Sequence, residues 1–213
     1  MKILCVSDQI DPLIYTNTIK QRYADVDLVL SAGDLPMEYL DFIVSTLNKP
    51  LLFVFGNHHT EDYTNCKTTG QFEIHFHGAT YIDARVRSEA GLIIAGLGGS
   101  MRYNQGENQF SDFQMSFRIL KLLPALVFNR IFRGRFLDVL LTHAAPSGIH
   151  DKKDKCHQGF KCFLWFMKVF KPRYLVHGHI HLYDLAELRI SSFLDTMVIN
   201  AYGHYLIDTG ENT

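Results

Sequence analysis

The sequence has few cysteines and no long apolar run, and both absences narrow the kind of protein it can be. Four cysteines occur in 213 residues and form no CxxC pair, so we expect reduced structural thiols rather than a disulfide framework. No apolar run approaches the roughly 20 residues that a membrane-spanning helix needs. The N-terminus combines one lysine with a short apolar stretch, which is not typical of a signal peptide. We therefore expect a cytoplasmic protein with no membrane partner.

The sequence also lacks a strong charge of either sign. The formal net charge is −1 and the isoelectric point is near 6.8, so nucleic acid is an unlikely partner. Hydrophobic residues make up 47% of the chain, which is enough to build a packed core. We expect a single domain over residues 1–213, because a chain of this length commonly forms one α/β unit.

Short apolar runs and amphipathic stretches alternate along the first half of the chain, which favours parallel strands joined by helices. We predict helices over about 14–24, 37–47, 110–131 and 157–170. We predict strands over about 2–7, 27–31, 51–55, 72–77, 80–87, 91–96, 137–142, 174–177, 182–189, 194–200 and 204–208. The short links within 72–96 and 182–208 indicate antiparallel pairs. The sum is an α/β fold of two mixed sheets packed face to face, with helices outside.

Five of the apolar runs end directly at residues of a kind that binds metals. The residues at these ends are Asp8, Asp34, Asn57 with His58, His143, and His179 with His181. In open α/β sheets the ligand site lies beyond the carboxyl ends of the strands. We therefore expect these side chains, far apart in the sequence, to meet at one rim of the sheets.

Carboxylates, an amide oxygen and imidazoles together suit Mn, Fe, Zn, Co or Ni, whereas a closed structural zinc site would use thiolates. Two such ions about 3.5–4 Å apart need a bridging carboxylate. A pair of ions clamps the attacking and leaving oxygens of a displacement at phosphorus and lowers the pKa of a shared water. The residue types therefore predict a two-metal centre for phosphoryl chemistry.

The blocks Asp8, Gly33-Asp34, Gly56-Asn57-His58, His143 and Gly178-His179-Ile180-His181 resemble, in order and spacing, the calcineurin-like metallophosphoesterase superfamily. The resemblance spans residues 8–181 and implies a four-layer αββα sandwich with two divalent metal ions. It implies that Asp34 bridges the two ions, and that His58 assists the leaving group. The implied ligands are Asp8 and His181 for the first ion, and Asn57, His143 and His179 for the second.

The first block departs from the Asp-x-His pattern of that family, because Ile10 stands where the histidine is expected. Isoleucine cannot bind a metal, so the first site lacks one nitrogen ligand. Asp11 or the amide oxygen of Gln9 could replace it, and an aspartate would favour harder ions such as Mn, Fe or Mg. Without a replacement the first site is weak and the chain holds a single ion. Both alternatives stay open.

Three further residues are candidates for contact with a substrate. Arg102 and Tyr103 follow a glycine-rich stretch, where an arginine can bind a phosphate through two hydrogen bonds and a tyrosine can stack on a ring. The alternative is an ordinary loop with a surface arginine. His157 lies near the start of a predicted helix, where it either faces the substrate or caps the surface.

The leading hypothesis for function is a metal-dependent phosphoesterase in which a metal-bridging hydroxide attacks a phosphodiester or phosphomonoester. The expected substrate is a small phosphate ester or nucleotide, and a diester is favoured by family analogy alone. The alternative is a weakened scaffold that binds protein partners, as the retromer subunit resembling these enzymes does. The basic and apolar segment 117–135 could then dock a partner or a membrane surface, although covering a sheet is its ordinary role. A DNA nuclease is disfavoured by the charge and length.

Overall fold

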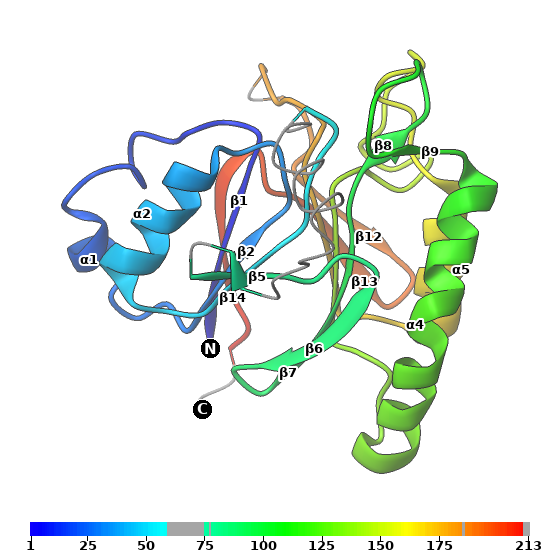
Figure 1. The fold of residues 1–213 in the computed structure, drawn as a ribbon, viewed down its shortest axis with the longest axis horizontal. Helices are drawn as coiled ribbons and strands as arrows, with labels where there is room; N and C mark the ends of the chain where they lie inside the picture. Colours follow the sequence, from blue (N-terminus) through cyan, green and yellow to red (C-terminus); the bar gives the residue numbers. More distant parts are fainter. Residues whose placement is uncertain (59–74, 77, 185, 211–213) are drawn as a thin grey trace.

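Two six-stranded mixed sheets form the centre of the protein (Figure 1). The computed structural model describes residues 1–58, 75–76, 78–184 and 186–210. The first sheet contains, in order across it, β14 (Gly203–Asp208), β1 (Lys2–Ser7), β2 (Leu28–Ser31), β3 (Leu51–Phe53), β5 (Ala79–Tyr81) and β4 (His75–Phe76). The second contains β12 (Ile190–Phe193), β13 (Thr196–Asn200), β11 (Tyr174–His177), β10 (Val139–Thr142), β7 (Leu92–Leu97) and β6 (Arg85–Glu89). A small parallel ribbon joins β8 (Ser100–Met101) to β9 (Gln109–Phe110).

The strands that precede the predicted metal ligands are parallel to one another within each sheet. In the first sheet β1 pairs with β2 and β2 with β3, while in the second β10 pairs with β7 and β11, all in parallel. Antiparallel strands lie at the edges, as predicted from the short links. The rim therefore consists of the carboxyl ends of five strands, which are β1, β2 and β3 in the first sheet and β10 and β11 in the second.

The molecule has four layers because each sheet is buried on both faces. Cys5, Leu30 and Val54 of the first sheet share one core with Leu141 and Val176 of the second. The short helix α1 (Ile19–Arg22) and helix α2 (Met37–Leu47) pack on the outer face of the first sheet. Helices α4 (Asp112–Arg133) and α5 (Lys161–Phe170) pack on the outer face of the second. The predicted αββα sandwich of two mixed sheets is confirmed.

Several predicted elements differ in extent from the observed ones. The predicted strand 80–87 is two strands in different sheets, because the chain turns at Ala84, whose φ is 48°, and crosses from β5 to β6. Among the described residues of 182–189 there is no strand: Asp184 instead accepts a hydrogen bond from the N–H of Ala186 and closes a turn. The predicted helix 14–24 is reduced to α1. Residues 72–74 and 77 of another predicted strand lie outside the described residues.

Helix α4 is a continuous helix of 22 residues with clear signals at both ends. Ser111 caps its start, where Ser111 and Gln114 exchange side-chain to backbone hydrogen bonds in a capping box, and Gly134 ends it with φ 73°. The helix continues through Pro124, which lies in its interior. Pro124 is exposed, so water can satisfy the carbonyl that loses its helical hydrogen bond. Among the described residues, no helix is both long and apolar enough to cross a bilayer.

Candidate metal centre

Three of the five strand ends turn sharply where they reach the rim. Asp8, Asp34 and His179 have φ values of 64°, 54° and 66°, a left-handed conformation that costs a residue with a side chain about 1–2 kcal/mol. Hydrogen bonds between the blocks hold these turns in place. The backbone N–H of His179 donates to both carboxylate oxygens of Asp8 at 3.0 and 2.9 Å, and the N–H of Asp8 donates to the carbonyl of Gly33 at 3.1 Å.

The glycines of the sequence blocks lie where the ligands touch the backbone. A Cβ atom added at Gly56 would lie 2.1 Å from Asp34 Oδ1 and 2.6 Å from His143 Cε1. A Cβ atom at Gly178 would lie 2.5 Å from Asp8 Oδ2. Real Cβ atoms essentially never come this close to another atom, so only glycine fits at either position.

Four acceptor atoms converge at the second predicted site. His143 Nε2 lies 3.1 Å from Asn57 Oδ1, 3.2 Å from His179 Nδ1 and 3.3 Å from Asp34 Oδ2. His143, His179 and Asn57 are buried, and 8% of the Asp34 side chain is exposed. The structure thus brings together all four of the side chains that the sequence assigns to the second ion.

In His143 and His179, the hydrogen bond made by one ring nitrogen determines that the other ring nitrogen is the one able to bind a metal. His143 Nδ1 lies 2.8 Å from the carbonyl of Ala32, and His179 Nε2 lies 2.8 Å from the carbonyl of Cys156. A carbonyl only accepts, so these nitrogens carry hydrogen, and in the neutral imidazoles the two facing nitrogens carry lone pairs. Two lone pairs, an amide oxygen and a carboxylate oxygen that face one another repel unless a proton on His143 Nε2 or a metal ion lies between them. The donor set therefore fits a divalent ion.

The electrostatics of the cluster also favour a positive charge. Burial opposes protonation of His143, but the carboxylates of Asp34 and Asp8 outweigh it and raise the pKa of His143 to about 9. Burial, together with the neighbouring His143, lowers the pKa of His179 to about 3. Burial raises the pKa of the Asp8 carboxyl. The pocket thus stabilises one positive charge at its centre and keeps His179 neutral, as a metal ligand must be.

Asp8 and His181, the predicted ligands of the first ion, lie at the edge of this cluster. His181 Nε2 is 3.9 Å from Asp8 Oδ1, and the two side chains are 39% and 1% exposed. The other nitrogen of His181 lies 2.7 Å from the Tyr183 hydroxyl, and its ring stacks on Tyr202 at a centroid distance of 4.9 Å. These contacts orient the ring so that Nε2 faces the carboxylate.

The residues that could replace the missing histidine take different positions. Asp11 Oδ2 lies 2.6 Å from His204 Nδ1, and the other carboxylate oxygen accepts a hydrogen bond from the N–H of Leu13. Gln9 and Ile10 are exposed on the loop after β1. The structure therefore gives Asp11 a partner away from the cluster, and a ligand role for Asp11 or Gln9 stays a prediction.

Two further residues of the rim lie close to the ligands. His58 donates its backbone N–H to Asp34 Oδ1 at 3.0 Å, and its side chain is exposed at the mouth of the site. The Tyr103 hydroxyl accepts a hydrogen bond from Asn57 Nδ2 at 3.2 Å. This contact turns the amide so that its oxygen faces His143, a positioning role that the sequence did not indicate for Tyr103.

Arg102 and His157 are held by other parts of the chain. The Arg102 guanidinium donates to the carbonyl of Gln109 at 3.1 Å. The His157 ring lies 5.2 Å from that of His179 and 2.9 Å, through Nδ1, from Asp154 Oδ1. Asp154, Cys156 and His157 also bring three potential ligand atoms within 4.8 Å of one another. Sequence reasoning singled out only His157 of this group, and the Asp-x-Cys-His spacing was the available signal.

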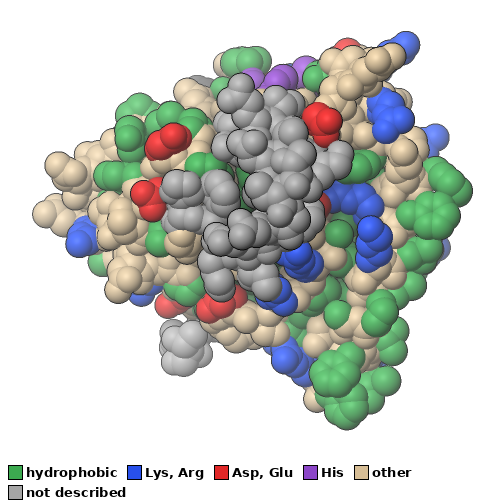
Figure 2. Space-filling model, viewed as in Figure 1, with side chains coloured by type: hydrophobic (Ala, Val, Ile, Leu, Met, Phe, Trp, Pro, Cys, Tyr) green, Lys and Arg blue, Asp and Glu red, His purple; other side chains and the backbone are tan. Residues whose placement is uncertain are grey.

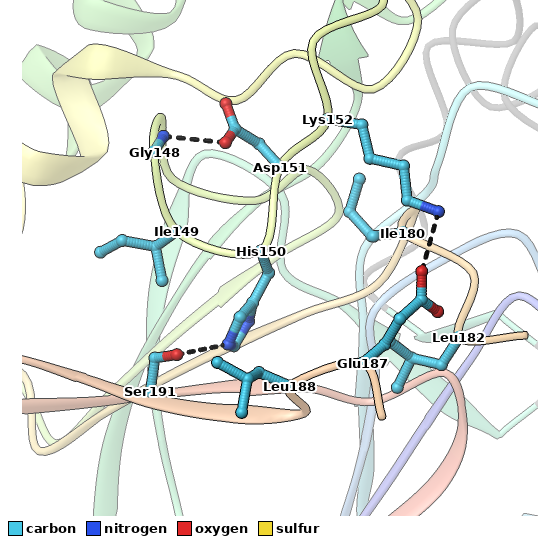
Figure 3. A pocket seen from close by; sticks show the side chains of 10 residues that line it. All are labelled: Gly148, Ile149, His150, Asp151, Lys152, Ile180, Leu182, Glu187, Leu188 and Ser191. Carbon is cyan, nitrogen blue, oxygen red and sulfur yellow. Dashed lines mark hydrogen bonds and ion pairs between the residues drawn. The ribbon is translucent and has the colours of Figure 1, made fainter. Parts of the chain in front are cut away.

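A cavity of about 420 Å³ lies between the loops that follow β10 and β11 (Figure 3). It contacts the rim through Lys152, which donates to the carbonyl of His181 at 3.3 Å and pairs with Glu187 at 3.4 Å. His150 and Ser191 hydrogen-bond across its floor at 2.8 Å. The lining residues are Gly148, Ile149, His150, Asp151, Lys152, Ile180, Leu182, Glu187, Leu188 and Ser191. None of the predicted metal ligands is among them.

Comparison with known proteins finds one family model and several solved structures that resemble this chain. The model of the calcineurin-like phosphoesterase family matches residues 1–183, whereas none of the curated proteins compared matches the sequence. One solved structure aligns over 98% of this chain and 95% of its own, with 12% identity and a TM-score of 0.66. That of TT1561 from Thermus thermophilus aligns over 95% and 89%, with 13% identity and a TM-score of 0.64. An archaeal phosphodiesterase aligns over 99% and 94% at 15% identity, but with a TM-score of 0.45. At 12% and 13% identity, the first two similarities show the fold alone.

Proposed function

The chain belongs to the calcineurin-like phosphoesterase family, and from this premise we propose that it is a metal-dependent hydrolase of phosphate esters. The observation that carries the proposal is the set of four facing atoms, His143 Nε2 and its three neighbours Asn57 Oδ1, His179 Nδ1 and Asp34 Oδ2, with the N–H groups of both imidazoles directed away to backbone carbonyls. Such a set is suited to binding a cation. Divalent ions bound here would supply Lewis-acid activation of the phosphate and of water.

The side chains of the rim divide into two ligand sets in this proposal. Asn57, His143 and His179 would hold the second ion, Asp8 and His181 would hold the first, and Asp34 would serve both. The set for the second ion is complete, whereas the set for the first ion is one imidazole short because of Ile10. Mn, Fe, Zn, Co or Ni suit the set for the second ion. The two ions thus differ in affinity, with the weaker one on the side of Asp8.

His58 is placed to act on the leaving group. Its backbone is tied to Asp34 while its imidazole stands exposed at the mouth, so it can donate a proton to the oxygen that departs from phosphorus. Tyr103 keeps the Asn57 amide in its ligating orientation. Arg102 and His157 contribute to substrate binding in this proposal, because Arg102 is next to Tyr103 and the His157 ring lies 5.2 Å from that of His179. The proposed substrate is a small phosphodiester or phosphomonoester such as a nucleotide, and a diester is favoured by family analogy.

The test is hydrolysis of bis(4-nitrophenyl) phosphate and 4-nitrophenyl phosphate with added Mn²⁺. We expect Asp34→Asn to lower kcat/KM by at least about a hundredfold, because a shared ligand is weakened. His58→Gln should lower kcat by about 10²–10⁴-fold with little change in KM. Asp195→Asn is the matched control, since this aspartate is 67% exposed and pairs only with the surface residue Lys171 among its described contacts. A folded wild-type protein without metal-dependent turnover would refute the enzyme and favour the scaffold.

A further inference from the structure

Helix α4 presents an apolar stripe to solvent on the side that faces away from the protein. Phe113, Phe117, Leu120, Val127, Phe128 and Ile131 are between 48% and 71% exposed. Most of them are three, four or seven residues apart, and the neighbours Val127 and Phe128 lie on either side of the line through the others, so all six share one face of the helix. The exposed Pro124 lies on the same face. At 1.5 Å per residue this outer stripe is about 27 Å long.

The outer stripe is not the face that holds the helix on the sheet. Met115, Ile119, Leu122 and Leu126 do that, and each is at most 1% exposed. The two sets lie on opposite sides of the helix, so α4 is apolar both inward and outward. A surface helix of a globular protein normally turns polar residues to water. A large exposed apolar patch is typical of a surface that contacts a protein or a membrane.

Helix α5 continues this apolar surface. Leu120 of α4 and Trp165 of α5 border the same groove, which has a volume of about 410 Å³. Trp165 is 48% exposed and Val169 40%. Figure 2 shows hydrophobic side chains along the right-hand edge of the molecule, over α4, with lysine and arginine side chains beside them. We call the exposed apolar residues of both helices the α4–α5 face.

The charges around the α4–α5 face are almost all positive. Exposed basic residues of the two helices are Lys121, Arg130, Arg133, Lys161 and Lys168. The two helices contain one acidic residue, Asp112. It accepts a hydrogen bond from the backbone N–H of Cys162 and is only partly exposed. A chain with a net charge of −1 thus concentrates positive charge beside this exposed apolar stripe.

We propose that the α4–α5 face docks on the surface of an anionic lipid bilayer, with its aromatic side chains in the interface and its basic side chains at the lipid headgroups. Aromatic and aliphatic residues on one side of a helix with lysines and arginines along its flanks are suited to this position. A second copy of the chain fits less well, because a two-fold contact would bring like charges together. The proposal does not depend on the proposed function, and it differs from the sequence-based expectation of no membrane partner.

The experiment measures sedimentation of the full chain with vesicles of phosphatidylcholine, with and without phosphatidylserine, at low and high salt. The apolar variant is Phe113→Ser/Ile131→Ser, whose residues are 71% and 67% exposed. The matched control is Leu188→Ser/Leu194→Ser, with the same two exposures on other elements. The charge variant is Lys121→Gln/Lys168→Gln. Thermal unfolding of each variant checks the fold, and all the changes are at exposed side chains.

We expect the wild type to bind the phosphatidylserine vesicles and to be released by high salt. The apolar variant should need at least about tenfold more lipid for half-maximal binding, the charge variant should bind more weakly at low salt, and the control should match the wild type. The proposal is overturned if the wild type does not bind the phosphatidylserine vesicles, or if it binds both kinds of vesicle equally. It is also overturned if the apolar variant binds as well as the wild type. Sedimentation velocity identifies the competing occupant: a dimer that the apolar variant dissociates, without vesicle binding, would show a second copy of the chain.

Discussion

Replacing Gly56 by alanine should disable the metal centre while leaving the fold intact. Gly56 follows β3, and its added Cβ atom would lie 2.1 Å from Asp34 Oδ1 and 2.6 Å from His143 Cε1. Ordinary van der Waals contacts begin at 3.4 Å, so the carboxylate oxygen must withdraw by about 1 Å, a shift that can reduce activity about a hundredfold. Metal–ligand distances tolerate only about 0.2 Å. Two ligands are therefore displaced by a single methyl group.

We expect Gly56→Ala to weaken Mn²⁺ binding by at least about a hundredfold. Isothermal titration calorimetry gives the affinity, and thermal unfolding in a chelator shows whether the metal-free fold is kept. Gly91→Ala is the control, because nothing lies within 4 Å of the added atom, although φ there is +78°. That control should lose about 1 kcal/mol of unfolding free energy and no metal affinity. Wild-type affinity in a folded Gly56→Ala protein would refute the shared site of Asp34 and His143.

Three further predictions concern the first site, the stability of the fold and its pH dependence. Ile10→His should raise the Mn²⁺ content towards two ions per chain by elemental analysis, and an unchanged content would show that the first site is not limited by this ligand. Arg118→Met should lower the unfolding free energy by about 3–5 kcal/mol in denaturant titrations, since it leaves the largely buried Asp83 carboxylate without its ion pair; a loss below about 1 kcal/mol would contradict this. Burial, with the neighbouring His150, lowers the pKa of His177 to about 3 in the folded state. Because the unfolded chain then binds more protons, stability should fall as the pH drops from about 6.5 towards 3, by up to about 1.4 kcal/mol per pH unit, and His177→Gln should reduce this slope.

The rim could be predicted because apolar runs and ligands are adjacent in the sequence. Each run buried between the layers ends where a parallel strand ends, so Asp8, Asp34 and His143 had to reach one edge once the strands were parallel. The contacts that tune the ligands could not be predicted. The carbonyls of Ala32 and Cys156 that select the imidazole nitrogens belong to the backbone, and no residue type marks them.

Contacts across long sequence separations were also beyond prediction. Asp11 pairs with His204, which lies 193 residues away on the edge strand β14, and only the fold brings them together. In the strand expected over 80–87, apolar and polar residues alternate without interruption from Ile82 to Arg87, and this pattern does not reveal that the chain changes sheets at Ala84. The sequence predicted that the basic residues of α4 are exposed to water. It could not predict which apolar residues are exposed as well, because that depends on how the helix packs on the sheet.

Anomalous diffraction from crystals soaked in Mn²⁺ would locate the metal ions without reference to activity. We expect a strong peak between His143 Nε2, His179 Nδ1, Asn57 Oδ1 and Asp34 Oδ2, and a weaker one between Asp8 and His181. The strong peak should disappear in His143→Ala crystals while the fold remains. A peak at Asp154 and His157 alone, or no peak at the rim, would contradict the proposed metal centre.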